Sequence, residues 1–318
     1  MERPILSARG AAGYLEALDN VLLLTHVRPD GDTIGSAAAL CRALRDCGQT
    51  AYLLPNPEIT ATYAPYAAPY WAPEGWQAEH IVSVDIADAS LLPENALSYR
   101  DRIELAIDHH PSQTFFARNT CLEADSAACG EIVYEIIQHL TALTADIALP
   151  LYVAVSTDCG GFQYGNTTAR THRIVAALMD VVDVAAVNKA LFRTKSRVRL
   201  AMESRMVADM KLFDHQRVVV MEIPLSLRQE MQATDADIEE LSALPALVEG
   251  TDCGVTLREL RPGTVKVSVR TGPRVDACAL CRILGGGGHH AASGATVEGT
   301  LDEARMAVLA AYRKVIGA

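Results

Sequence analysis

The chain has 318 residues, of which 50% are apolar and only 5% aromatic, and its formal net charge at pH 7 is −11. That length accommodates two domains of ordinary size, and the scarcity of aromatic residues favours helices and parallel strands over a β-sandwich. Proteins that hold long nucleic acids by their phosphates are usually basic, so the acidic balance disfavours a binding track for long duplexes. It leaves room for a compact site in which metals or arginines reverse the charge locally.

Eight cysteines are scattered along the chain, and only Cys278 and Cys281 form a close pair. A structural zinc site would need a second such pair, so we expect reduced thiols packed as small apolar groups. The sequence contains no apolar run as long as a membrane span, and residues 1–10 lack the core of a signal peptide. We therefore expect a cytoplasmic protein with no membrane partner.

The first 190 residues alternate between short apolar runs and helical patterns. The runs predicted to be strands are residues 21–25, 50–54, 80–86 and 103–107. The predicted helices are residues 34–47, which Gly48 ends, and residues 131–140, 147–156 and 168–180. This alternation predicts an α/β domain over residues 1–190, with a mainly parallel sheet covered by helices on both faces.

The composition changes after this region. Residues 191–212 are charged and helical in pattern, which indicates a helical connector. Beyond it we predict strands at 218–223 and 265–269, a four-glycine loop at 285–288 and a closing helix at 301–316. We expect residues 213–318 to form a smaller α/β C-terminal domain.

Side chains that commonly bind metals stand at the ends of four apolar segments. They are His26 with Asp30 and Asp32, then Asp85, then Asp108 with His109 and His110, and finally Asp158. In an open parallel sheet, ligands bind beyond the carboxyl ends of the strands, so the first three groups should converge at one edge. Carboxylates gathered there need cations to neutralise them, which predicts a pair of divalent ions. Each residue alone has a structural explanation, such as an N-cap at Asp32 or an Asx-turn at Asp158.

These residues carry a family resemblance. The spacing H-x-x-x-D-x-D from His26, the single Asp85, the Asp-His-His triplet from Asp108 and the Thr-Asp pair ending at Asp158 resemble the DHH phosphoesterase superfamily. The stretch SVRTGPRVDACALCRILGGGGHHAASG, residues 268–294, is similar to the DHH-associated C-terminal domain. The resemblance covers about residues 15–315. Domain order and size are most like those of the small bacterial oligoribonucleases that also remove the 3′-phosphate of adenosine 3′,5′-bisphosphate (pAp).

The resemblance implies a two-metal site. One ion would be held by His26, Asp30 and Asp85, and the other by Asp32, Asp85, His109 and Asp158. The two catalytic residues would be His110, facing the substrate phosphate, and Asp108, supporting the histidines. Carboxylate and imidazole ligands without thiolate favour two Mn²⁺ ions, with Mg²⁺ or Co²⁺ as substitutes.

The implied chemistry is attack on phosphorus by a water activated between the two ions, with His110 stabilising the phosphate or protonating the leaving oxygen. The second domain would bind the substrate through Arg270, Thr271, Gly286, Gly287, Gly288 and His289. Glycines let a backbone approach a phosphate closely, and an arginine binds a second anionic group. A flexible turn and a solvated surface charge are the structural explanations of the same residues.

The implied substrates are single-stranded RNA of two to five nucleotides and pAp, in either polarity of cleavage. Two other enzymes fit the same metal site: a phosphodiesterase for linear dinucleotides of the pApA type and a manganese inorganic pyrophosphatase. The latter is disfavoured because its second lobe carries a basic Ser-Arg-Lys-Lys type motif where this chain has GGGGHH. A nucleotide-binding regulatory protein is the non-enzymatic alternative, and the charged connector is compatible with a homodimer.

Overall fold

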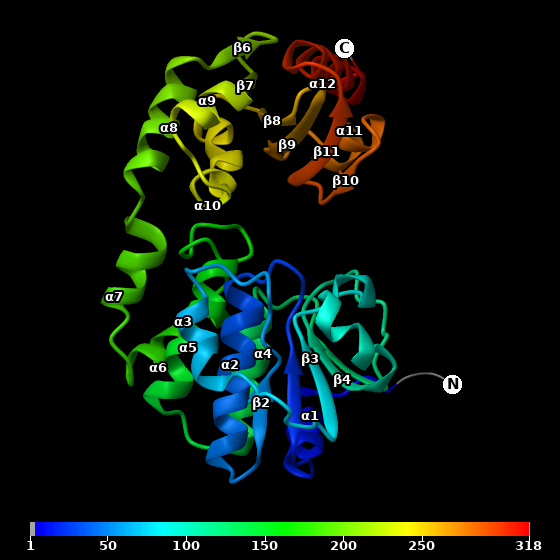
Figure 1. Cartoon of the computed structure of the whole chain (residues 1–318), viewed down its shortest axis with the longest axis vertical. Helices are drawn as coiled ribbons and strands as arrows, with labels where there is room; N and C mark the ends of the chain where they lie inside the picture. The colour runs from blue at the N-terminus through cyan, green and yellow to red at the C-terminus, as the bar shows by residue number, and fades with distance from the viewer. Residues whose placement is uncertain (1–3, 318) are drawn as a thin grey trace. The chain divides into compact units, whose positions relative to one another are not determined.

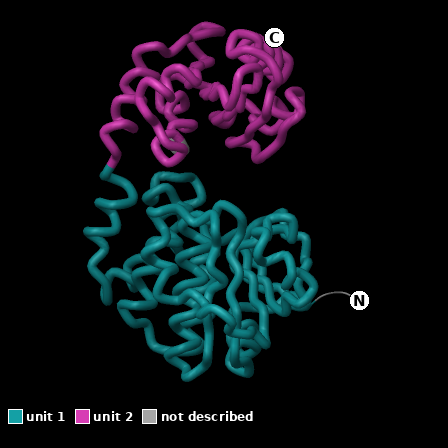
Figure 2. Tube along the Cα trace, viewed as in Figure 1, with its two compact units in different colours: residues 1–194 teal, residues 195–318 magenta. Residues whose placement is uncertain are grey.

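The computed structural model describes residues 4–317, and the chain divides into two compact units, residues 1–194 and 195–318 (Figure 2). Each unit has its own sheet and its own hydrophobic core (Figure 1). The predicted α/β class is confirmed. Among the helices of residues 4–317, none combines the length and the apolar character that a membrane span needs. The eight cysteines are all unpaired.

A five-stranded parallel sheet forms the centre of the first unit. In spatial order its strands are β2 (Ala51–Leu53), β1 (Val21–Leu24), β3 (His80–Val84), β4 (Ile103–Asp108) and β5 (Asn119–Leu122). The chain reverses its direction of travel across the sheet between β1 and β3. The carboxyl ends of these two strands therefore form the switch point at which open α/β sheets bind ligands. The sequence prediction missed β5, because NTCL is not a continuous apolar run.

Alternate strand residues pack on opposite faces of this sheet. Leu23 and Val82 belong to the core beneath the α-helices, and Leu22 and Ile81 to the core on the other face. The helices on the first face are α1 (Ala8–Glu16), α2 (Gly31–Asp46), α4 (Cys129–Leu140) and α5 (Ala145–Asp158). The other face is covered by the 3₁₀ helices η2 (Ala89–Leu91) and η3 (Glu94–Arg102) with aromatic side chains around them. The four helices predicted from the sequence for this unit are confirmed. The second face of the sheet, also expected to carry helices, is covered by short helices of the 3₁₀ type.

Close packing of α2 against α5 brings the start of the first helix beside the end of the second. A Cβ atom on Gly35 would lie 2.2 Å from the carbonyl oxygen of Pro150, and one on Gly31 would lie 2.3 Å from Oγ1 of Thr157. Only glycine permits this approach, which sets the start of α2 beside the end of α5. The shorter helices of this unit are α3 (Ala64–Ala67), η1 (Ala68–Tyr70), α6 (Ala169–Met179), α7 (Ala185–Asn188) and the π-helical turn η4 (Lys189–Arg193).

The stretch predicted as a helical connector is interrupted. Thr194 leaves the helical conformation after η4, and the side chain of Ser196 caps α8 (Arg197–Ala208) by accepting a hydrogen bond from the amide of Arg199. The boundary between the two compact units falls at this interruption. The helical prediction for the last residues of 191–212 is wrong, because strand β6 begins at Lys211.

The second unit is built on a mixed six-stranded sheet. In spatial order its strands are β10 (Gly287–Gly288), β11 (Ala292–Glu298), β9 (Thr264–Thr271), β8 (Cys253–Arg261), β7 (Val218–Ile223) and β6 (Lys211–Phe213). One face packs against α11 (Ala277–Ile283) and α12 (Leu301–Ile316). The other packs against α8, α9 (Leu225–Glu230), α10 (Asp235–Ile238) and η5 (Glu239–Leu247). The predicted four-glycine loop is a loop only in part, since Gly287–Gly288 pair with β11.

Candidate metal centre

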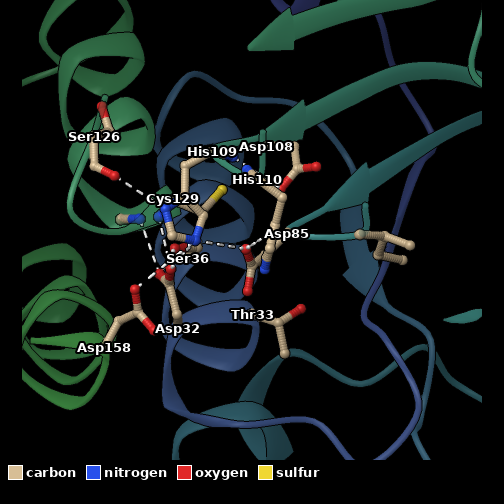
Figure 3. A network of polar contacts seen from close by, with 12 residues as sticks. Asp32, Thr33, Ser36, Asp85, Asp108, His109, His110, Ser126, Cys129 and Asp158 are labelled. Atoms are coloured by element: carbon tan, nitrogen blue, oxygen red, sulfur yellow. Dashed lines mark hydrogen bonds and ion pairs between the residues drawn. The ribbon is translucent and has the colours of Figure 1, made fainter. Parts of the chain in front are cut away.

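Acidic and imidazole side chains meet at the carboxyl edge of the first sheet, beyond β1, β3 and β4. Figure 3 shows four of them, Asp32, Asp85, His109 and Asp158, pointing toward a common centre. The loop after β1, the start of α2, the ends of β3 and β4 and the end of α5 supply these groups. The structure thus brings together all six residues that the family resemblance implies as metal ligands.

His26, Asp30 and Asp85 form one group whose ligand atoms lie within 4.8 Å of one another. Nε2 of His26 lies 3.6 Å from Oδ1 of Asp30 and 3.8 Å from Oδ2 of Asp85. Nδ1 of His26 donates to the carbonyl oxygen of Val27 at 2.8 Å, so Nε2 is the nitrogen that would bind a cation. Asp30 is the N-cap of α2, so the capping role suggested for Asp32 belongs to Asp30 instead.

Asp32, His109 and Asp158 form a second group within the same limit of 4.8 Å. Nε2 of His109 lies 3.8 Å from Oδ2 of Asp32, 3.5 Å from Oδ1 of Asp85 and 3.8 Å from Oδ2 of Asp158. Asp85 therefore lies between the two groups, close to His26 of the first and to His109 of the second. A third combination, Asp85 with His109 and His110, also has the spacing of a metal site.

Asp85 has the features of a residue held in place for a bound cation. Its backbone is in the left-handed region, with φ of 61°, and its amide donates to the carbonyl oxygen of Ile107 at 2.8 Å. Such a conformation costs a non-glycine residue about 1 kcal/mol or more. Within the described residues, its buried Oδ1 has no hydrogen-bond partner, and an unsatisfied buried acceptor costs about 1–3 kcal/mol. A cation at this atom would satisfy it, and the donor set fits divalent ions.

Asp108, by contrast, is satisfied by the protein itself. It is fully buried, and its Oδ1 accepts from the amides of His109 and His110 at 2.8 and 3.2 Å and from Nδ1 of His110 at 2.8 Å. Its Oδ2 accepts from Nε2 of Gln113 at 2.6 Å. Asp108 therefore shapes the turn that carries both histidines. Its hydrogen bond also raises the pKa of His110, whose Nε2 points away from this bond.

Several hydrogen-bond partners of the predicted metal ligands are absent from the sequence prediction. Asp32 accepts hydrogen bonds from the amides of Cys129 and Gly130, at the start of α4, at 2.6 and 2.9 Å, and from Oγ of Ser36 at 3.0 Å. The start of a helix favours a carboxylate. Ser36, four residues after Asp32 on α2, has a spacing that could have been recognised, but the contact with α4 joins residues 97 apart.

The carboxylates of this edge are poorly tolerated as charges in the absence of cations. Burial, and then the charges of Asp158 and Asp30, raise the pKa of Asp32 well above its usual range. Burial and the charges of Asp32 and Asp30 have the same effect on the pKa of Asp85, and burial raises that of Asp158. For Asp30, burial opposes ionisation, but the contact with His26 lowers its pKa. Two divalent ions would remove this mutual repulsion.

Cys129 does not add a thiolate to the centre. Burial, and then the charges of Asp85 and Asp32, raise the pKa of its thiol well above the ordinary value. Its Sγ lies 3.4 Å from the carbonyl oxygen of Ile107, as expected for a neutral thiol that donates. The donor set is therefore oxygen and imidazole nitrogen.

The predicted substrate-binding residues gather in the second unit. Arg270 on β9 pairs with Ala292 on β11, and the amide of Thr271 donates to the carbonyl oxygen of Ala291 at 3.0 Å. The amide of His289 donates to the carbonyl oxygen of Ala292 at 2.9 Å, which closes the turn between β10 and β11. The predicted residues Arg270, Thr271 and those from Gly286 to His289 thus share one end of this sheet.

Two of the glycines have a structural reason to be glycine. A Cβ atom on Gly286 would lie 2.1 Å from the carbonyl oxygen of Gly294, and Gly288 has φ of 144° with Ser293 close by. Gly287 is different, because a Cβ there would meet no atom within 4 Å. The backbone near Gly287 is therefore the part of this segment that a ligand could approach.

A parallel sheet with carboxylates and imidazoles gathered at its switch point defines an α/β protein with a candidate divalent-metal site. Residues 20–155 match the model of the DHH family, N-terminal domain. A relative from Thermus thermophilus, named bifunctional oligoribonuclease and PAP phosphatase NrnA, is 32% identical over 96% of this chain and 93% of its own length. The chain belongs to the DHH family of phosphoesterases.

Two further comparisons agree with this assignment. A Bacillus subtilis relative, also named bifunctional oligoribonuclease and PAP phosphatase NrnA, is 23% identical over 88% of this chain and 90% of its own length. The crystal structure of an exopolyphosphatase-related protein from Bacteroides fragilis superposes with a TM-score of 0.88 and 21% identity, covering 100% of this chain and 99% of that one. The second similarity establishes the fold of the whole chain.

Proposed function

We propose that this protein hydrolyses short oligoribonucleotides of two to five nucleotides to mononucleotides and removes the 3′-phosphate of pAp. The observation that carries the proposal is the buried Oδ1 of Asp85, which has no hydrogen-bond partner among the described residues and lies between two groups of candidate metal ligands. Relatives named for both activities match nearly the whole chain, the second sheet included. A site on the first unit would perform the hydrolysis, and residues of the second would bind the substrate.

The site would hold two divalent ions, with Asp85 as the shared ligand. His26 and Asp30 would complete one coordination set, and Asp32, His109 and Asp158 the other. Oxygen and imidazole donors without thiolate support Mn²⁺, with Mg²⁺ or Co²⁺ as substitutes. When bound, the ions supply an activated water and neutralise charge on the phosphoryl oxygens.

The catalytic residues contributed by the protein are His110 and Asp108. Asp108 accepts the Nδ1 proton of His110 at 2.8 Å and raises its pKa, which favours an imidazolium. That imidazolium would donate from Nε2 to a phosphoryl oxygen or to the leaving oxygen. Its side chain is 34% exposed, so a substrate can reach it.

Substrate binding would fall to the second unit. The guanidinium of Arg270 would bind an anionic group of the substrate, with Thr271 and His289 beside it. Gly286, Gly287 and Gly288 would let backbone amides approach a phosphate. Residues 1–190 would thus be the catalytic domain, 191–212 a connector and 213–318 the substrate-binding domain.

The proposal is tested by hydrolysis assays on the metal-stripped protein with Mn²⁺ restored. Separate reactions contain an RNA dinucleotide, pAp, linear pApA and pyrophosphate. We expect mononucleotide release from the RNA dinucleotide and phosphate release from pAp. Turnover of pyrophosphate alone would show that the protein is an inorganic pyrophosphatase. Preference for pApA would show that it is a linear dinucleotide phosphodiesterase. Nucleotide binding without any turnover would indicate a regulatory protein.

A second assay defines the substrate length. RNA oligomers of graded length, each labelled at one end, are incubated with the Mn²⁺-loaded protein, and products are followed over time. Rates should be highest for two to five nucleotides, and the label shows from which end cleavage begins. Equal rates on long and short RNA would contradict the proposed size selection.

A further inference from the structure

His109 is held from the side opposite to the candidate metal centre. Its Nδ1 lies 3.1 Å from the carbonyl oxygen of Ser126, while its Nε2 faces the carboxylates of Asp32, Asp85 and Asp158. A carbonyl oxygen only accepts hydrogen bonds, so Nδ1 donates to it, and Nε2 is the nitrogen that would bind an ion at the centre. The position of Ser126 therefore decides where His109 presents its lone pair.

Ser126 is itself fixed by Arg170. Nη1 of Arg170 donates to Oγ of Ser126 at 3.1 Å, and Nη2 donates to Oε2 of Glu123 at 2.9 Å and lies 2.7 Å from Oε1 of Glu135. Oγ of Ser126 donates in turn to the same Oε2 of Glu123 at 3.1 Å. A planar guanidinium has a rigid set of donors, so these contacts fix the orientation of Ser126 more firmly than a point charge would.

The next residue, Ala127, is held on both sides of its peptide. Its amide donates to the buried carboxylate of Glu131 at 3.3 Å, and its carbonyl oxygen accepts from Nδ2 of Asn166 at 2.9 Å. Nδ2 of Asn166 also donates to the carbonyl oxygen of Asp158 at 3.1 Å. One amide group therefore joins the segment that holds His109 to the backbone of Asp158.

The two bracing side chains come from the same stretch, which follows Asp158 along the chain. Asn166 lies near the end of the loop after α5, and Arg170 lies in the first turn of α6, which a capping box between Thr168 and Thr171 initiates. This stretch thus follows Asp158, one proposed ligand of the second ion, and supports the segment that holds His109, another proposed ligand of that ion.

We propose that Asn166 and Arg170 are positioning residues that set the separation of His109 and Asp158 and so the affinity of the site for its second ion. The inference rests on the proposed metal-binding role of these two ligands. Neither positioning residue belongs to the three groups of side chains with the spacing of a metal site. Arg170 acts through Ser126, and Asn166 acts through the backbone of Ala127 and Asp158.

The test is a calorimetric titration of the metal-stripped protein with Mn²⁺ alone, without substrate. The wild type should show two binding events. Arg170→Met and Asn166→Ala should each weaken one event by about 10–100-fold, the usual effect of removing a partner of a metal ligand, and leave the other unchanged. Asn166 is exposed, so its truncation leaves the core intact.

Matched controls come from the opposite edge of the same unit. Arg42 also contacts two carboxylates, Asp46 at 3.0 Å and Asp146 at 3.1 Å, with 37% of its side chain exposed. The side-chain amide of Asn119 donates to the carbonyl oxygen of Glu104 at 3.1 Å, as that of Asn166 does to two others. Arg42→Met and Asn119→Ala should bind both ions like the wild type.

A spectroscopic measurement separates positioning from general stability. Nitrogen spectra of ¹⁵N-histidine-labelled, metal-free protein report which ring nitrogens of each histidine carry a proton, and His109→Gln assigns the signal. His109 should carry its proton on Nδ1 in the wild type and in both controls, and lose this preference in Arg170→Met and Asn166→Ala. Unchanged tautomer and unchanged Mn²⁺ affinity in those variants would overturn the inference. Absence of Mn²⁺ binding by the wild type would overturn the proposed function instead.

Discussion

The two regions that the family resemblance singles out differ in how firmly the protein holds them. At the sheet edge of the first unit, Asp32, Asp85 and His109 are buried or nearly so and lie in a network of hydrogen bonds (Figure 3). In the second unit, Gly287, Gly288 and His289 are exposed, and sheet pairing uses part of their backbone. Hydrogen bonds within the protein do not remove the repulsion among the carboxylates of the first region, which raises the pKa of Asp32 and Asp85 and favours a bound cation. The second has a structural explanation as well.

The largest effect is expected from Asp85→Asn. Asparagine tolerates the left-handed backbone of this position but removes the charge shared by both metal sets. Hydrolysis should fall by at least about three orders of magnitude, because the two-metal activation of water is lost, and Mn²⁺ binding should weaken at both sites.

The same variant should be at least as stable as the wild type without metal, since it removes a buried carboxylate that the other acids disfavour. Thermal unfolding in EDTA measures this. If the variant still binds two ions tightly, Asp85 is not a metal ligand. If it is strongly destabilised, the role of Asp85 is structural.

Arg270→Ala probes the second region. Loss of a charged hydrogen bond to the substrate should lower kcat/KM on an RNA dinucleotide by about 10–100-fold, with calorimetric Mn²⁺ binding unchanged. Lys266→Ala is the matched control, because Lys266 lies exposed on the same strand. Equal effects of the two substitutions would show that Arg270 contributes only general surface charge and does not bind the substrate.

The glycines allow a finer separation of ligand approach from packing. Gly286→Ala should destabilise the fold by about 1–3 kcal/mol, as overpacking does, because its Cβ would collide with the carbonyl oxygen of Gly294. Gly287→Ala has open space and should leave the unfolding midpoint unchanged while raising KM for short RNA. If Gly287→Ala keeps the wild-type KM, the segment is a turn and nothing more.

The smallest effect expected is in the pH dependence of stability. Folding raises the pKa of Asp32 and Asp85, so these groups favour the folded state below their unfolded pKa, and that contribution is lost as pH rises through the folded pKa. The metal-free protein should therefore unfold at lower temperature at pH 8 than at pH 5.

Added Mn²⁺ should reverse this trend, and its benefit should be greater at pH 8. At an ion concentration 100-fold above Kd, one site stabilises by about 2.7 kcal/mol, or several degrees in Tm. Melting curves at both pH values, with EDTA or Mn²⁺, provide the measurement. A larger benefit at pH 5 would show that these carboxylates are not the ligands.

Sequence reasoning succeeds where side-chain identity and strand order suffice. The apolar runs that became β1, β3 and β4 each end in an acid or a histidine, and parallel strands bring such ends to one edge. It fails for contacts made by the backbone. The amides of Cys129 and Gly130 on Asp32, and the carbonyl oxygen of Ser126 on His109, leave no trace in residue identity.

The second sheet shows the same limit. The prediction missed β8, whose nine residues CGVTLRELR include a glycine near the start and charged residues toward the end. It also placed Gly287 and Gly288 in a loop, because a two-residue strand is defined by its partner β11 and not by its own composition. Local pattern cannot identify a strand whose pairing residues lie elsewhere in the chain.

Anomalous diffraction from crystals grown with Mn²⁺ tests the central claim most directly. We expect two strong peaks at the carboxyl edge of the first sheet, both in contact with the carboxylate of Asp85, one beside His26 and the other beside His109. A single peak away from Asp85, or none at this edge in protein that hydrolyses RNA, would contradict the account.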